Sequence, residues 1–88
     1  MEMFYTLVDA NDLPVKVKVD KDCGYYELSE VSLNNAVLFK EKYIAEGELN
    51  NINRIKNNPD YYDLYVNNPL ELPLKVMGVK SIRQLFVV

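Results

Sequence analysis

Histidine is absent from this sequence of 88 residues, and cysteine occurs once, as Cys23. The lack of histidine excludes the Ser-His and Cys-His pairs that activate nucleophiles, histidine-based acid–base catalysis, and zinc sites of the Cys/His kind. A single cysteine excludes an internal disulfide framework. We therefore expect a non-enzymatic protein that holds neither a metal nor another cofactor.

The sequence also lacks a long apolar run and an excess of basic residues. No apolar stretch approaches the ~18 residues of a membrane-spanning helix, and the N-terminus has no basic segment of the kind that begins a signal peptide. Net charge is −3, from 10 Lys and Arg against 13 Asp and Glu. We expect a cytoplasmic protein with no membrane partner, and its charge disfavours direct nucleic-acid binding.

The composition is that of a small globular domain. Hydrophobic residues make up 49% of the chain and charged residues 26%, which is not the balance of a disordered segment. A chain of this length supports one modest core. We expect a single domain over residues 1–88, because no linker, repeat or low-complexity segment divides it.

Strand patterns fill the first third of the chain. An apolar, β-branched run at residues 3–8 is followed by turn formers at 9–14 and by strict alternation in VKVKV (15–19), which predicts a β-hairpin. The run YYEL (25–28) predicts a third strand. Together these segments predict a small antiparallel meander.

The middle of the chain has a helical period. Its apolar residues are three or four positions apart, which draws one stripe along a helix. We expect a short turn near residues 33–38 and a main helix over roughly 40–57. Gly47 costs ~1 kcal/mol relative to alanine inside a helix, so the pattern predicts a possible kink or break there.

The stretch KNNPDYYDLYVNNPLEL (56–72) is framed by two Asn-Asn-Pro triplets. The first is typical of a helix start, with asparagine as cap and proline at the first helical position. The second is typical of a helix end. These signals favour a short second helix between the triplets. The alternative is a strand, with one face formed by Tyr62, Leu64 and Val66.

Alternating leucines in the C-terminal part predict a strand over about 72–80, which Pro73 would place at a sheet edge. Residues 82–88 form one more strand or a short helix. The fold class that follows is α+β. It comprises a small antiparallel sheet, made of the N-terminal hairpin or meander and the C-terminal strand, packed by one main helix, with a short second helix.

Two arrangements of acidic residues have spacings that also occur in known kinds of site. Asp9, Asn11 and Asp20 match the spacing of ligands in a calcium loop, but proline stands where that loop needs glycine, so we expect ordinary turns. Asp60 and Asp63 share a face of the expected short helix, where two carboxylates can do acid–base work. Helix capping on a solvated face is the simpler interpretation of this pair.

Tyrosine gives the best indication of a binding surface. Two helical turns cannot bury all three tyrosines of the stretch 56–72, and tyrosine is enriched in protein interfaces. With the neighbouring aspartates, these side chains predict an acidic, aromatic surface suited to a basic partner. The predicted partner-binding residues are Asp60, Tyr61, Tyr62, Asp63 and Tyr65, followed by Glu41, Glu46 and Glu48.

Residues 24–49, GYYELSEVSLNNAVLFKEKYIAEGEL, resemble small accessory proteins of phages and prophages from low-GC bacteria. Such proteins pair a hairpin and a tyrosine-rich strand with an NA-x-x-F element, here Asn35, Ala36 and Phe39. A helix follows, with an alanine that corresponds to Ala45. Several small acidic phage proteins bind and inhibit a host enzyme, CRISPR nucleases among them. The resemblance therefore implies an inhibitor, but it assigns no site residue.

These observations predict a protein-binding module. The first hypothesis is a phage-encoded inhibitor that acts in the host cytoplasm and occupies the nucleic-acid groove of a host nucleic-acid-handling or defence protein. The alternative is a small phage structural or assembly protein that forms a homo-oligomer through an edge strand. A third hypothesis is a nucleic-acid-binding regulator that uses Lys16, Lys18 and Lys21. The sequence leaves the partner's identity and the oligomeric state open.

Overall fold

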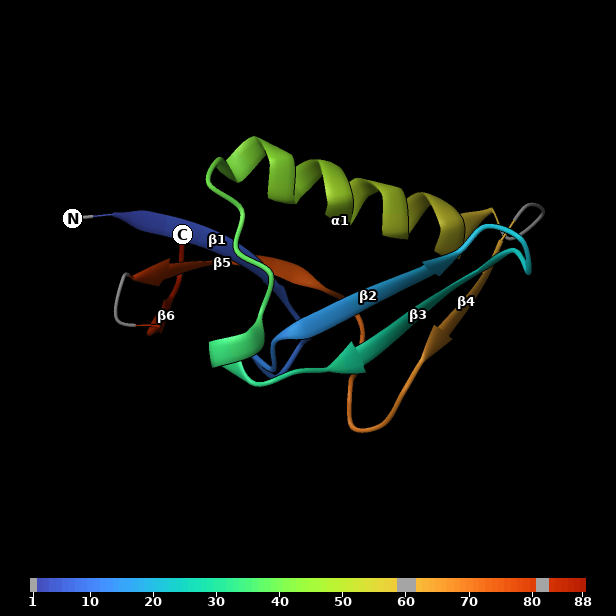
Figure 1. Ribbon diagram of the computed structural model, residues 1–88, viewed down its shortest axis with the longest axis horizontal. Coiled ribbons are helices and arrows are strands. Elements are labelled where there is room, and N and C mark those ends of the chain that lie inside the picture. The colour runs from blue at the N-terminus through green and yellow to red at the C-terminus, as the bar shows by residue number, and fades with distance from the viewer. Residues whose placement is uncertain (1, 59–61, 81–82) are drawn as a thin grey trace.

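The computed structural model describes residues 2–58, 62–80 and 83–88. Within them, six strands form two sheets packed against one main helix, so the predicted α+β class is confirmed (Figure 1). The elements in chain order are β1 (Met3–Val8), β2 (Val15–Asp20), β3 (Tyr25–Glu30), the 3-10 helix η1 (Leu33–Asn35), α1 (Lys42–Asn57), β4 (Asp63–Val66), β5 (Lys75–Lys80) and β6 (Leu85–Phe86).

The strands divide into two sheets of three, whereas the sequence predicted one. One sheet has the order β1-β5-β6 and is antiparallel throughout. The other has the order β2-β3-β4, with β2 antiparallel and β4 parallel to β3. The predicted hairpin between β1 and β2 is reduced to one isolated bridge, Val8 with Pro14. Pro14 has no N–H to extend a ladder, and β1 pairs along its whole length with β5 instead.

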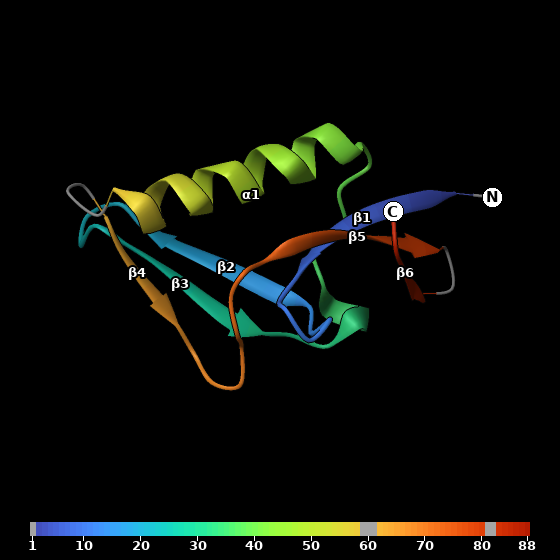
Figure 2. The ribbon, with the colours of Figure 1, turned by 180° about the vertical axis from the view of Figure 1, so that it is seen from behind.

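Helix α1 runs along one side of both sheets (Figure 1, Figure 2). It buries Ala45 and Ile52, and Ile52 belongs to a core that also takes residues from both sheets and from the loop before β5. The helix is continuous, so the break considered at Gly47 does not occur. Gly47 lies on the exposed side, and packing of the opposite stripe stabilises the helix across it.

The predicted short second helix is wrong for residues 63–66, which form β4. Asn58 ends α1 instead of starting another helix, because its N–H donates to the C=O groups of Arg54 and Ile55. Residues 59–61 lie outside the described part of the chain. β4 forms because pairing with β3 supplies its backbone hydrogen bonds, and because its alternate side chains, Leu64 and Val66, pack on the core.

The C-terminal strand is shorter and more central than predicted. β5 begins at Lys75 and lies between β1 and β6, so Pro73 does not mark an edge strand. Pro73 instead belongs to the loop that precedes β5, in which the Asn68–Pro69 and Leu72–Pro73 peptide bonds are cis. Of the two possibilities for residues 82–88, the strand is found, at Leu85–Phe86.

Candidate protein-binding surface

The sheet β2-β3-β4 has an inner face on the core and an outer face toward solvent. Successive side chains of a strand point to opposite faces. Val17, Leu28 and Val66 are cross-strand neighbours and pack in the core, which defines the inner face. The residues on the outer face of the three strands are Lys16, Lys18, Asp20, Tyr25, Glu27, Ser29, Asp63 and Tyr65.

The strand register brings acidic and tyrosine side chains together at one end of the outer face. Asp20 lies opposite Tyr25, and Tyr25 lies opposite Asp63. The ring of Tyr65 meets that of Tyr25 edge-on, with centroids 5.7 Å apart. Glu27, on β3, lies opposite Tyr65, on β4. We call this set, Asp20, Tyr25, Glu27, Asp63 and Tyr65, the outer tyrosine face.

The outer tyrosine face carries an excess of negative charge. Its three carboxylates, from Asp20, Glu27 and Asp63, share the outer face of the sheet with two ammonium groups, those of Lys16 and Lys18. Tyr65 is 52% exposed. Its edge-to-face contact with Tyr25 restrains the ring, which lowers the entropy lost when a partner packs on it. The surface is therefore acidic, aromatic and partly preorganised.

The structure separates Tyr62, which precedes β4, from Tyr65, the predicted tyrosine within β4. Tyr62 is half-buried and its ring meets Tyr26 edge-on, with centroids 5.3 Å apart. The two rings line a hollow beside the C-terminal part of α1, with Arg54 and Ile55. Tyr62 is thus on the side of the sheet opposite Tyr65. Two other predicted residues, Asp60 and Tyr61, lie outside the described residues.

The predicted glutamates lie on the helical side of the molecule. Glu41 stands at the N-cap position of α1 without a side-chain capping bond, Glu46 is exposed on the helix, and Glu48 is half-buried. Glu48 lines an apolar cavity of about 170 Å³ between β1, β2 and α1. Because α1 covers the inner face of the sheet, these glutamates do not share a surface with Asp63 and Tyr65.

The predicted partner-binding residues did not include three members of the outer tyrosine face, Asp20, Tyr25 and Glu27. Period-2 alternation in residues 15–20 and 25–30 places these side chains on a common face of a β2–β3 pair. Their place beside Asp63 follows from the parallel pairing of β3 with β4. That pairing joins segments about 38 residues apart in sequence, and local pattern carries no information on it.

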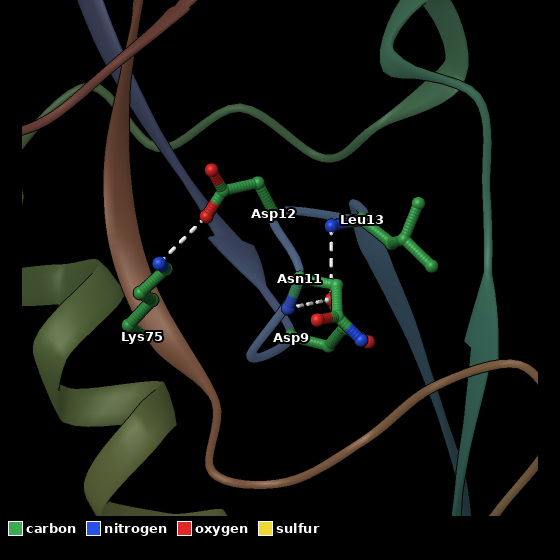
Figure 3. A network of polar contacts seen from close by, with 5 residues as sticks. All are labelled: Asp9, Asn11, Asp12, Leu13 and Lys75. Atoms are coloured by element: carbon green, nitrogen blue, oxygen red, sulfur yellow. Dashed lines mark hydrogen bonds and ion pairs between the residues drawn. The ribbon is translucent and has the colours of Figure 1, made fainter.

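Asp9 is the fully buried carboxylate among the described residues, and its role is to stabilise the fold. Burial by itself raises the pKa of the Asp9 carboxyl, but backbone N–H donors from Glu71, Leu13 and Asn11, with the charge of Lys75 nearby, hold the pKa below its ordinary value. The N···O distances are 2.8, 2.9 and 2.8 Å in that order, and Figure 3 shows the bonds from Asn11 and Leu13. Asp9 thus ties the β1–β2 turn to the loop before β5.

No group of three or more His, Cys, Asp or Glu side chains in residues 2–58, 62–80 and 83–88 is placed to hold a metal ion. No helix in these ranges is both long enough and apolar enough to cross a bilayer. Comparison of the chain with protein-family models, curated proteins and solved structures finds no match.

Proposed function

We propose that this chain is a non-enzymatic protein-binding module that holds a basic partner on the outer tyrosine face. The observation that supports this most is the cross-strand row of Asp20, Tyr25 and Asp63, with the exposed ring of Tyr65 against it. Tyrosine provides a large contact area for few rotatable bonds, and carboxylates attract lysine and arginine and speed encounter.

The partner class we propose is a host nucleic-acid-handling or defence protein, with this chain acting as a phage-type inhibitor in the host cytoplasm. A groove that binds nucleic acid is lined with lysine and arginine, to which an acidic surface is complementary. The net charge of −3 and the three carboxylates of the outer tyrosine face support this choice. Lys16 and Lys18 share the outer face with those carboxylates, which weakens the proposal of a nucleic-acid-binding regulator.

A pair of matched double variants tests the site. The first combines Asp63→Lys with Tyr65→Ala on the outer face. The control combines Glu46→Lys with Tyr43→Ala on α1, where Tyr43 is 72% exposed. Each variant reverses one charge and removes one exposed tyrosine, so they differ in the face they alter.

The measurement is capture of a partner from bacterial lysate by the tagged chain, quantified at low and high salt. We expect the outer-face variant to capture at least about tenfold less partner than the native chain does, and the control variant to capture as much as the native chain. Added salt should weaken capture by the native chain, because exposed charges are screened. Equal capture by both variants, or loss confined to the control, would refute the site.

A further inference from the structure

β4 is an edge strand, and no described residue hydrogen-bonds to the outward backbone groups of Leu64 and Val66. No strand lies beyond it among the described residues. The N–H of Asp63 donates to Gly24 C=O, and the N–H of Asn67 donates to Leu28 C=O, both at 2.9 Å. Odd-numbered residues therefore face β3. Leu64 and Val66 turn their N–H and C=O groups to the open edge, which offers four hydrogen-bonding groups.

A groove follows this edge and is lined by residues from both faces of β4. It is an open hollow of about 510 Å³ between the end of α1, β4 and the loop before β5. Its lining is mainly apolar, with one lysine and one aspartate, and consists of Ile55, Lys56, Asp63, Leu64, Tyr65, Val66 and Leu72. A strand added to β4 would place alternate side chains in this groove.

We propose that the partner contributes an extended segment that adds to β4 as a fourth strand of the sheet, with basic and apolar residues in alternation. Its apolar side chains would enter the groove beside Leu64 and Val66. Its basic side chains would lie on the outer face beside Asp63 and Tyr65. Backbone pairing at a sheet edge provides affinity, and alternate side chains provide specificity.

The other edge of the same sheet already holds a strand of this chemistry. β2 reads VKVKVD and pairs with β3 so that Val17 lies opposite Leu28 on the inner face. Lys18 lies opposite Glu27 on the outer face. β4 repeats the surface that β3 offers to β2, with apolar residues inward and Asp63 outward. At both edges of the sheet, the inner face therefore favours apolar residues and the outer face favours basic residues in the strand that pairs there.

This inference rests on the proposed function in one respect, that the partner is basic. The probe is the labelled pentapeptide acetyl-Lys-Val-Lys-Val-Lys-amide, titrated against the native chain by fluorescence anisotropy. The matched control replaces its three lysines by glutamates. Two further versions of the lysine peptide carry N-methyl groups on backbone amides. One is methylated at both valines, and the other at the lysines within the peptide.

Only one edge of an added strand faces β4, so only one of the two N-methylated sets should disrupt pairing. We expect the lysine peptide to bind at least about tenfold tighter than the glutamate peptide, and one methylated form to lose at least about tenfold while the other does not. In the bound state, NMR should show the amides of Leu64 and Val66 newly protected from exchange. Asp63→Lys should weaken binding, whereas Glu46→Lys should not.

Three results would overturn strand addition. If both methylated peptides bind like the parent, the basic ligand is held by charge alone, and the proposed function stands without the strand. If neither charged peptide binds while lysate capture still depends on Asp63 and Tyr65, the inference fails and the proposed function again stands. If sedimentation shows a dimer whose Leu64 and Val66 amides are already protected, the edge belongs to a second copy of the chain.

Discussion

We predict that Asp9→Asn removes a large part of the stability of this protein. The Oδ1 atom of Asp9 accepts the N–H groups of Asn11 and Leu13, and Oδ2 accepts that of Glu71. An asparagine whose oxygen keeps the first two bonds must turn its NH2 group toward the N–H of Glu71. Two donors then face each other at a position that is fully buried in the native protein.

The magnitude follows from these contacts. A hydrogen bond to a charged acceptor contributes about 1.5–3 kcal/mol, and a buried donor left unpaired costs about 1–3 kcal/mol. The two remaining bonds also lose their charge assistance. We therefore expect Asp9→Asn to lower the free energy of unfolding by about 3–5 kcal/mol. A chain of 88 residues has about 4–13 kcal/mol in total, at about 0.05–0.15 kcal/mol per residue.

The effect should depend on pH in a defined direction. The pKa of Asp9 is lowered in the folded state, so its stabilisation is complete above the unfolded pKa of about 3.9 and is lost as pH falls through the folded pKa. Asparagine does not titrate. The difference in unfolding free energy between the native chain and the variant should therefore be largest near neutral pH and shrink below about pH 4.

Urea unfolding followed by circular dichroism at several pH values measures this difference. Asp12→Asn is the matched control, because the Asp12 carboxylate is about half exposed and pairs with Lys75 at 2.6 Å (Figure 3). Such an exposed pair contributes about 0–1 kcal/mol, and asparagine tolerates the positive φ of Asp12. A cost below about 1 kcal/mol for Asp9→Asn, or a cost that stays constant into acid, would refute the role assigned to Asp9.

Two further substitutions and one labelling experiment test other parts of the fold. Gly47→Ala should raise the unfolding free energy by about 1 kcal/mol, because a Cβ there meets no atom within 4 Å and alanine favours the helix; no gain would contradict an exposed, regular helix at this point. Gly78→Ala should cost about 1–3 kcal/mol, since its Cβ would overlap the Phe86 ring, and adding Phe86→Leu should recover part of the loss. Cys23 is exposed, so a maleimide should label it in the folded chain without denaturant, and a protected thiol would place the β2–β3 turn wrongly.

The spacing of apolar residues correctly predicted those elements that bury one face and expose the other. The alternation of residues 15–19 is that of a strand with one apolar face, and β2 is found there with Val15 and Val17 on the core. The apolar stripe of residues 40–57 is that of a helix with one buried side, and α1 covers Lys42–Asn57. In both cases the side chains that face the core recur at the spacing of a single element, so no distant contact is needed to recognise it.

Local pattern failed where a distant segment decides the structure. The capping signals around residues 58–69 favour a helix, but β3 offers a ladder to residues 63–66 that satisfies their backbone and buries alternate side chains. The candidate site changed for the same reason. Tyr62 and Tyr65 are three residues apart and would lie near each other on a helix, whereas here Tyr62, just before β4, and Tyr65, within β4, lie on opposite sides of the sheet.

By itself, the sequence determined the α+β class, the main helix and the acidic, tyrosine-rich character of the chain. These properties follow from composition and from periods of 2 and 3.6 residues. The tertiary structure decided which strands pair, and therefore that Asp20 and Tyr25 join Asp63 and Tyr65 on one surface. It also decided that, among the described residues, β4 is the last strand of its sheet. Hydrogen bonds between strands join residues distant in sequence, so these choices depend on the fold as a whole.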